Sequence, residues 1–229
     1  MKRPTYVTDK ALKQFIKSAL EEDIQSGDHS TLSTIPSDLM QSAKLLVKED
    51  CILAGVELAE IIFKTFDKNL KIEVFIKDGE NAKVGDIAFI VTGKAQSILS
   101  TERLVLNCMQ RMSGIATLTH DWDSRLIGTK TKLLDTRKTT PNFRICEKWA
   151  VAIGGGTNHR YGLYDMIMLK DNHIDYNGSI TNAVKMTQDY LKKNKLKLKV
   201  EVETRNLAEV EEAAKLAGKG IDRIMLDNI

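Results

Sequence analysis

The sequence has few cysteines, no long apolar run and little net charge. Its 229 residues include three cysteines, Cys51, Cys108 and Cys146, an odd and scattered set without metal-ligand spacing. We therefore expect reduced, buried thiols, and nothing that flanks them supports a catalytic cysteine. No apolar segment approaches the length needed to cross a membrane, and residues 1–5 lack the apolar core of a signal peptide. A formal charge of +3 is too small by itself to argue for nucleic-acid binding. We expect a cytoplasmic protein with neither a membrane nor a nucleic-acid partner.

The composition is otherwise ordinary for a soluble globular protein, with 42% hydrophobic and 28% charged residues. The length suffices for one large domain or two smaller ones. The first 95 residues predict an α+β layer with mostly local, antiparallel strands. Thr8 is a plausible cap of its first helix. The expected elements are helices at 8–22 and 55–66 and strands at 42–53, 70–77 and 87–92.

A long helical segment follows, from residue 97 to about residue 126. Small residues at positions 113–117 interrupt its pattern and indicate either close backbone packing or a break. Arg103 lies near the start of this segment. On sequence alone, the favoured interpretation is a surface arginine paired with Glu102 or Asn107.

From about residue 130 the pattern changes to strand, loop and helix in repetition. Charged residues end the expected strands at positions 137, 170, 203 and 227, at intervals of 33, 33 and 24 residues. These intervals fit successive βα units with parallel strands. A (β/α) barrel and an open doubly wound sheet both satisfy them. We favour the barrel because its strand ends all surround one mouth, whereas an open sheet has one switch point. The expected strands are 132–136, 166–169, 198–202 and 221–226, with helices from Thr140, at 180–191 and after Asn206.

These strand ends and one glycine-rich loop supply a candidate site. Several cations near one ligand indicate a multiply anionic substrate. Carboxylates opposite them suit sugar hydroxyls, Mg²⁺ or a developing positive charge. The alternatives are a solvated basic turn at Arg137 and Lys138 and a core ion pair between Lys170 and a glutamate. The candidate residues are Arg137, Lys138, Lys170, Glu201 or Glu203, Asp227, and the loop Thr157-Asn158-His159-Arg160.

The ordered motifs of the chain closely resemble those of the quinolinate phosphoribosyltransferase family, also called carboxylating nicotinate-nucleotide pyrophosphorylase. Each tripeptide alone is a weak signal, but the set covers essentially the whole chain in order. The motifs are Glu22-Asp23 with Gly27-Asp28, Thr101-Glu102-Arg103 with Asn107 and Ser113-Gly114-Ile115-Ala116-Thr117, Asp135-Thr136-Arg137-Lys138-Thr139-Thr140-Pro141, Gly155-Gly156-Thr157-Asn158-His159-Arg160, Met168-Leu169-Lys170-Asp171-Asn172-His173, Val200-Glu201-Val202-Glu203 and Leu226-Asp227-Asn228.

The resemblance implies an α/β fold of the type II phosphoribosyltransferase kind. Residues 1–110 would form an N-terminal α/β sandwich domain, and residues 111–229 an incomplete (β/α) barrel. It also implies a homodimer or an assembly of dimers. The reaction would be Mg²⁺-dependent transfer of phosphoribosyl from 5-phosphoribosyl 1-pyrophosphate to quinolinate, giving nicotinate mononucleotide, pyrophosphate and CO₂. Family barrels continue through further βα units with a glycine-rich segment like a phosphate cradle. We therefore assign no residue to the 5′-phosphate and expect residues 1–229 alone to be inactive.

By the same resemblance, Arg137, His159 and Arg160 bind the quinolinate carboxylates. Lys138 and Lys170 line the same basic pocket, and both join the expected catalytic residues. Glu201 and Asp227 complete the catalytic set on the ribose and metal side, although Glu203 remains an alternative to Glu201. Arg103 matches an arginine that crosses the dimer interface into the neighbouring site. The direct Mg²⁺ ligands stay unassigned.

Three other functions stay open at this point. The chain could be a same-fold paralogue acting on another ring acid, such as the relatives found with molybdenum-transport genes. It could be a barrel aldolase with Lys170 as the Schiff-base amine, although the arginine cluster argues against this. It could also be a non-catalytic module that retains only the fold.

Overall fold

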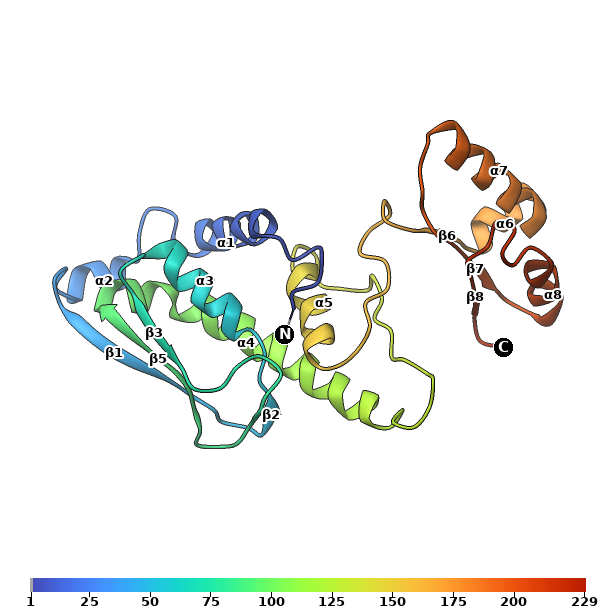
Figure 1. Ribbon diagram of the computed structural model, residues 1–229. Coiled ribbons are helices and arrows are strands. Elements are labelled where there is room, and N and C mark those ends of the chain that lie inside the picture. The colour runs from blue at the N-terminus through green and yellow to red at the C-terminus, as the bar shows by residue number, and fades with distance from the viewer. Residues whose placement is uncertain (1) are drawn as a thin grey trace. The chain divides into compact units, whose positions relative to one another are not determined.

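The computed structural model describes residues 2–229. The chain forms two compact units, Met1–His159 and Arg160–Ile229. Figure 1 shows their elements in order along the chain.

Antiparallel strands make up the sheets of the first unit, as the sequence predicts. The main sheet has the strand order β1-β5-β3, and a short second sheet pairs β2 with β4. The expected strand at 42–53 is in fact two strands in different sheets. The β1–β5 ladder shifts register between Leu45 and Leu46, and after this irregularity the chain leaves the sheet to pair with β4. The strands are β1 (Met40–Leu46), β2 (Cys51–Ile52), β3 (Lys71–Val74), β4 (Asn81–Ala82) and β5 (Ile87–Lys94).

Five helices lie in the described residues of this unit, 2–159. Thr8 caps the first helix as predicted, because its side chain accepts a hydrogen bond from the backbone N–H of Ala11 at 3.2 Å. The sequence does not predict the second helix, which has only six residues and therefore shows no apolar period. The helices are α1 (Asp9–Ile24), α2 (His29–Thr34), α3 (Val56–Phe66), α4 (Ala95–Ser124) and α5 (Arg144–Ile153).

The small residues within α4 mark close packing, and the helix is not broken there. Ser113 Oγ donates to the carbonyl of Ala54 at 3.1 Å and accepts from its N–H at 3.0 Å. A Cβ added at Gly154, just after α5, would collide with the backbone carbonyl of Ala116. Gly114 itself faces open space. The close approach of α4 to its neighbours therefore depends on Ser113 and Ala116.

A parallel three-stranded sheet organises the second unit, and this confirms the predicted parallel topology. The strand order is β6-β7-β8, with Met168 beside Glu201 and Glu201 beside Arg223. Three helices accompany the sheet (Figure 1). The sequence does not predict the first of these helices, because it is short and follows the strand directly. The elements are β6 (Ile167–Leu169), α6 (Asp171–Asn177), α7 (Ile180–Lys193), β7 (Val200–Thr204), α8 (Leu207–Lys215) and β8 (Arg223–Leu226).

Two local predictions around residue 137 are wrong. The expected strand at 132–136 makes only one isolated bridge, between Leu134 and Thr157, because no neighbouring strand pairs with it. The expected helix from Thr140 begins instead at Arg144. Asn142 has a φ of 61°, a left-handed conformation that interrupts a right-handed helix. Arg137 and Lys138 therefore lie on an irregular loop.

The predicted boundary between domains at residues 110 and 111 falls inside α4, a continuous helix of 30 residues. The compact units divide later, between His159 and Arg160. The predicted boundary itself stays a prediction.

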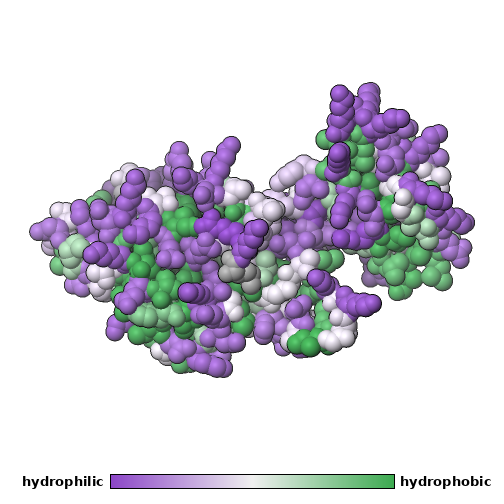
Figure 2. Space-filling model, viewed as in Figure 1, coloured by the Kyte–Doolittle hydropathy of each residue, from purple (hydrophilic) through white to green (hydrophobic). Residues whose placement is uncertain are grey.

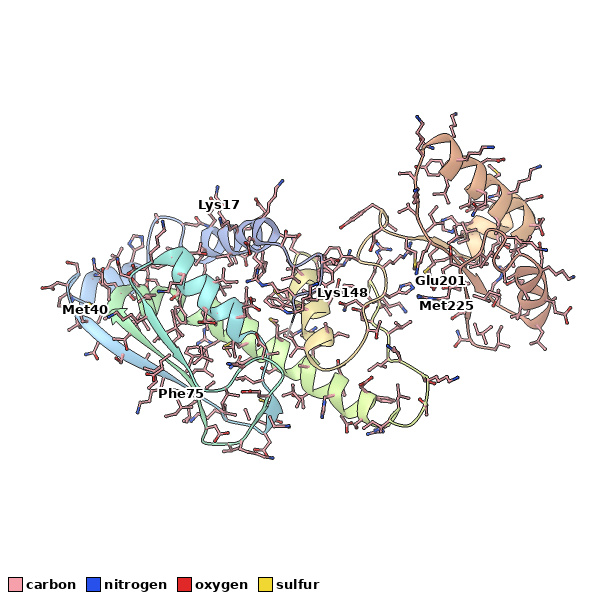
Figure 3. All side chains as sticks on the ribbon, viewed as in Figure 1. Lys17, Met40, Phe75, Lys148, Glu201 and Met225 are labelled. Carbon is pink, nitrogen blue, oxygen red and sulfur yellow. The ribbon has the colours of Figure 1, made fainter. Side chains whose placement is uncertain are left out.

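The surface carries both hydrophilic and hydrophobic side chains. Figure 2 shows hydrophilic residues over much of each unit, with hydrophobic ones reaching the surface between them. Met40 and Phe75, labelled in Figure 3, are 60% and 50% exposed at the main sheet of the first unit. Among residues 2–229, no helix combines the length and apolar character needed to cross a membrane.

Candidate active site

The basic loop of the first unit presents Arg137 and Lys138. The Arg137 carbonyl accepts hydrogen bonds from the N–H of Thr139 at 2.9 Å and from Arg144 Nη2 at 3.3 Å, so the loop backbone is held from α5. Lys138 is exposed. Arg137 is half-buried, and no described residue accepts a hydrogen bond from its buried Nε. A buried guanidinium N–H without an acceptor is suited to an anionic ligand.

A buried carboxylate joins this loop to the glycine-rich loop that carries His159. Asp135 Oδ1 accepts from the backbone N–H of His159 at 2.7 Å, and Oδ2 accepts from Asn158 Nδ2 at 2.7 Å. The ammonium of Lys148, which projects from α5 (Figure 3), forms an ion pair with the same carboxylate. The structure therefore brings Arg137, Lys138 and His159 onto two loops that are bonded together. The sequence does not predict a role for Lys148, since one lysine in an amphipathic helix carries no signal of burial.

Glu147, the neighbour of Lys148 on α5, holds the other side of the basic loop. Its carboxylate accepts from the N–H of Thr140 at 3.0 Å, from the hydroxyl of Thr140 at 2.9 Å and from Arg111 at 2.8 and 3.0 Å. Burial acts to raise the pKa of Glu147, but the bonds from Arg111 and Thr140 outweigh it, and the pKa lies below its usual value. The carboxylate is therefore ionised wherever the loop is folded at neutral pH.

In the second unit, two cross-strand ion pairs hold the glutamates of β7. Lys170 Nζ lies 2.9 Å from Glu203 Oε2, and Arg223 Nη1 lies 3.0 Å from Glu201 Oε2. The Glu201 side chain, labelled in Figure 3, is 1% exposed and that of Glu203 is 13% exposed. The ion pair between Lys170 and a glutamate, one of the open alternatives, is present, and its partner is Glu203.

Asp227 follows the end of β8 and is exposed. Its N–H donates to the carbonyl of Thr204 at 2.9 Å, so the ladder between β7 and β8 continues to this residue. Lys170 follows β6, and Glu203 lies one residue before the end of β7. Since the three strands are parallel and adjacent, Lys170, Glu203 and Asp227 lie along the carboxyl edge of one sheet.

Two arginines of the candidate set lie outside these groups. Arg160 opens the second unit, where it is half-buried and donates from Nη1 to the carbonyl of Met166 at 3.3 Å. Arg103 is exposed on α4, and its side chain forms no hydrogen bond or ion pair with another described residue. The expected partnership of Arg103 with Glu102 or Asn107 is therefore not observed.

No cluster of three or more histidine, cysteine or acidic side chains in residues 2–229 could hold a metal ion alone. The three cysteines are free. The hydrogen bond with Cys108, together with burial, raises the pKa of the Cys146 thiol, and a thiol in this state is a poor nucleophile.

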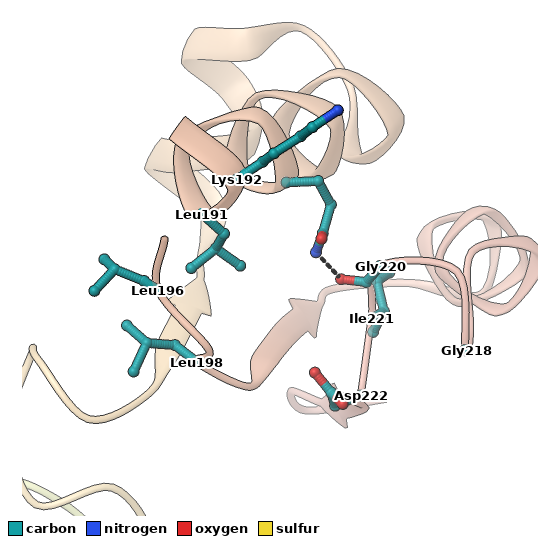
Figure 4. Close-up of a pocket in the computed structure, with 9 residues that line it drawn as sticks. Leu191, Lys192, Leu196, Leu198, Gly218, Gly220, Ile221 and Asp222 are labelled. Atoms are coloured by element: carbon teal, nitrogen blue, oxygen red, sulfur yellow. Dashed lines mark hydrogen bonds between the residues drawn. The ribbon is translucent and has the colours of Figure 1, made fainter. Parts of the chain in front are cut away.

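A hollow of about 430 Å³ in the second unit lies at the other edge of the sheet (Figure 4). Leu198 and Asp222, which line it, precede the starts of β7 and β8. Two residues of its lining are bonded to each other, since Gln188 Nε2 donates to the carbonyl of Gly220 at 2.9 Å. Because the charged residues of the site follow the strand ends, this hollow is separate from them.

Two family models match the chain. "Quinolinate phosphoribosyl transferase, N-terminal domain" matches residues 28–113, and "Quinolinate phosphoribosyl transferase, C-terminal domain" matches residues 115–229. The chain belongs to the quinolinate phosphoribosyl transferase family.

Named relatives agree with this assignment. The chain is 49% identical to a rice protein named "Nicotinate-nucleotide pyrophosphorylase [carboxylating], chloroplastic", over 99% of this chain and 60% of the relative. It is 38% identical to a Synechocystis protein named "Probable nicotinate-nucleotide pyrophosphorylase [carboxylating]", over 99% of this chain and 73% of the relative. The chain spans 60–64% of the length of the plant relatives it matches.

Solved structures confirm the predicted fold class. The crystal structure of NadC from Streptococcus pyogenes is similar with a TM-score of 0.88 and 39% identity, over 99% of this chain and 78% of that one. The nicotinate-nucleotide pyrophosphorylase from Francisella tularensis gives a TM-score of 0.87 and 35% identity, over 100% of this chain and 79% of that one.

Proposed function

We propose that the protein transfers the phosphoribosyl group of 5-phosphoribosyl 1-pyrophosphate to quinolinate with loss of CO₂, as a pentosyltransferase of NAD synthesis. The products would be nicotinate mononucleotide and pyrophosphate. The observation that carries the proposal is the basic loop of Arg137 and Lys138, bonded to the loop of His159 in a chain of this family. A dicarboxylate requires several fixed cations or N–H donors, and this arrangement supplies them.

On the quinolinate side, Arg137, His159 and Arg160 would bind the two carboxylates. Arg137 supports this role because its buried Nε has no acceptor among the described residues. Lys138 is exposed beside it and would add charge to the same pocket. Attack of the pyridine nitrogen on the anomeric carbon makes the ring a pyridinium. The positive nitrogen then stabilises the carbanion left when the adjacent carboxylate departs as CO₂, and a proton takes the place of that carboxylate on the ring.

On the ribose side, carboxylates would stabilise the positive charge that develops at the anomeric carbon as pyrophosphate leaves. The sequence predicts Glu201 and Asp227 for this role and leaves Glu203 open. The position of Glu203 near the strand end, with Lys170 at 2.9 Å, supports Glu203 as the residue that faces substrate. Glu201 lies one pleat below it, buried against Arg223.

We include Mg²⁺ in the proposal. When bound, the ion would neutralise the charge on the departing pyrophosphate. Mg²⁺ takes oxygen ligands and is commonly held by one or two carboxylates together with substrate phosphates. Glu203 and Asp227 at the edge of the sheet fit this mode, which needs no cluster of three protein ligands.

A homodimer in which Arg103 enters the neighbouring site is also proposed. Its support is that Arg103 is exposed on α4, while a hollow of about 660 Å³ lies between α4 and the strands β1 and β2. Two inactive variants, Arg103→Ala and Lys138→Ala, should regain activity when mixed, because one of the two sites in a mixed dimer is intact. Verified mixed dimers without recovery would contradict the shared site.

A cytoplasmic location completes the proposal. Three free cysteines are usual in a reducing compartment, and Cys108 and Cys146 remain thiols although they are hydrogen-bonded to each other. The rice relative is named chloroplastic and a tobacco relative mitochondrial. A fluorescent fusion of the full-length protein that collects in an organelle would overturn this location.

The deciding experiment measures ¹⁴CO₂ release from carboxyl-labelled quinolinate by the full-length protein. Release should require both 5-phosphoribosyl 1-pyrophosphate and Mg²⁺. Quinolinate that is never decarboxylated, with turnover of another ring acid under the same conditions, would favour a paralogue. Borohydride trapping of a carbonyl substrate on Lys170 would favour the aldolase alternative.

A further inference from the structure

The carboxylate of Asp135 lies at the centre of a buried cluster that connects three separate segments of the first unit. It accepts hydrogen bonds from Asn158 Nδ2 and from the N–H of His159, both at 2.7 Å, and it pairs with Lys148. The side chains of Lys148 and Asp135 are 1% and 7% exposed. A carboxylate with so little solvent must be compensated by its partners.

Lys148 supplies the positive charge that compensates the Asp135 carboxylate, and it does so from a buried helix. It lies within α5, whose residues 145–150 are all buried. Its ammonium also lies 3.5 Å from the carbonyl of Thr136, one residue before Arg137. Its own carbonyl accepts from Asn158 Nδ2 at 2.8 Å. One lysine therefore contacts both the basic loop and the loop of His159.

The amide of Asn158 completes the cluster. Its oxygen accepts from the hydroxyl of Tyr6 at 2.8 Å, while its nitrogen donates to Asp135 and to the Lys148 carbonyl. Between the two loops, the backbone makes one isolated bridge, Leu134 with Thr157. Beyond this bridge, no backbone–backbone hydrogen bond joins the two loops among the described residues. Arg144 and Glu147 hold the Arg137 loop to α5, and the Asp135 cluster is the link from there to His159.

We propose that Lys148 is a positioning residue for substrate binding, which sets the spacing between the Arg137 loop and the His159 loop through the Asp135 carboxylate. This inference rests on the proposed function, in which Arg137 and His159 bind the two carboxylates of one substrate. Lys148 does not touch the substrate. It acts by holding the Asp135 carboxylate in place, and this carboxylate accepts the hydrogen bond from the His159 N–H.

Two single variants and their combination separate positioning from mere stability. Lys148→Met leaves a buried carboxylate without its cation, and Asp135→Asn leaves a buried ammonium without its anion. Each should lower the melting temperature and weaken quinolinate binding by about 10- to 100-fold, as expected when binding groups shift by about 1 Å. The double variant Lys148→Met/Asp135→Asn removes both charges and should recover the melting temperature.

Quinolinate binding should not recover in the double variant. An asparagine at position 135 has one accepting oxygen, whereas Asp135 accepts from His159 and Asn158 on two oxygens. The control is Lys64→Met, since within residues 2–229 the Lys64 ammonium donates only to the backbone carbonyls of Lys68 and Leu70. Isothermal titration with quinolinate and thermal melts of the full chain give the two readouts. A double variant that recovers both stability and binding would overturn the positioning role.

Hydrogen exchange at the His159 amide tests the same inference without substrate. The amide should exchange at least tenfold faster in Lys148→Met than in wild-type protein or Lys64→Met. If wild-type protein binds no quinolinate, the proposed function fails, but the exchange result still decides whether Lys148 fixes the loop. Equal exchange in Lys148→Met and Lys64→Met would contradict the inference.

Discussion

The two units present their charged residues in different ways. In the first unit, Arg137, Lys138 and His159 lie on irregular loops whose placement depends on side-chain bonds from Asp135 and Glu147. In the second unit, the charged residues follow parallel strands whose backbone ladders fix them. Lys170 forms an ion pair with Glu203, and Arg223 forms one with Glu201.

The difference indicates where each unit is vulnerable. A backbone ladder spreads its restraint over many hydrogen bonds, so one side-chain change moves the strand end little. The loops of the first unit depend on a few buried polar groups, and loss of one leaves its partners unsatisfied. We expect the basic loops to be sensitive to remote substitutions and the acidic edge to be sensitive mainly to its own residues.

The largest effect is expected at Arg137 itself. Arg137→Ala should weaken quinolinate binding by about 2–5 kcal/mol, because a charged hydrogen-bond donor to a carboxylate is lost. Isothermal titration measures the loss, with Arg125→Ala as the control, since Arg125 is an exposed arginine of the same unit. Unchanged affinity in Arg137→Ala would remove this residue from the site.

At the carboxyl edge of the β6-β7-β8 sheet, substitution of Glu203 should affect mainly kcat, and substitution of Glu201 mainly stability. Glu203→Gln should lower kcat about 100-fold, or about 2.7 kcal/mol, by removing a charge that stabilises the transition state. Glu201→Gln should mainly lower stability, because it leaves Arg223 facing a buried neutral amide. Steady-state kinetics measures kcat of both variants, and urea unfolding measures their stability. A kcat loss confined to Glu201→Gln would reverse the assignment.

Glu147→Gln should destabilise the first unit by about 1.5–3 kcal/mol, the usual range for hydrogen bonds to a charged group. Because the pKa of Glu147 is lowered on folding, its contribution is present above the ordinary glutamate pKa of about 4.3 and is lost as pH falls through the folded value. The difference in unfolding free energy between wild type and variant should therefore shrink below about pH 4.3. Exposed Glu102→Gln is the control, and a pH-independent difference would contradict the explanation.

The smallest effects test whether the units are independent. Thr8→Ala removes the cap of α1 and Asn206→Ala removes the cap of α8, and each should cost about 1 kcal/mol. Site-resolved hydrogen exchange should show faster opening only in the unit that carries the change. Opening that spreads equally through both units would mean that they unfold together.

Periodicity explains why the second unit was the easier one to predict. Its strands, the α7 helix and the Asn206 cap follow from apolar runs, turn residues and one capping asparagine. The positions of the strand ends then predict Lys170, Glu203 and Asp227 as site residues. The missed helix α6 begins directly after its N-cap residue, Lys170, which is not one of the usual capping residues. Nδ1 of His173, in the first turn, accepts from the Lys170 N–H at 3.0 Å.

The loops of the first unit follow no period, and this is where prediction from the sequence fails. An apolar run before Asp135 predicts a strand, but a strand also needs a neighbour, and only Thr157 pairs with the segment. Lys148 and Glu147 have polar side chains on a helix, which normally indicate a solvent-facing side. Their burial is decided by partners 13 and 7 residues away, at Asp135 and Thr140. Composition and residue spacing do not predict contacts of this kind. The family motifs nevertheless identified the loops that carry Arg137 and His159.

The close approach of α4 to the end of α5 has a practical consequence for engineering. Gly154 leaves no room for a methyl group beside the Ala116 carbonyl, so a library randomised at this position should return glycine. Gly114 lies in the same helix as Ala116 but faces open space. Alanine there would gain about 1 kcal/mol of helix propensity at no steric cost. A designer who wants a more heat-resistant protein should therefore replace Gly114 with alanine and keep Gly154.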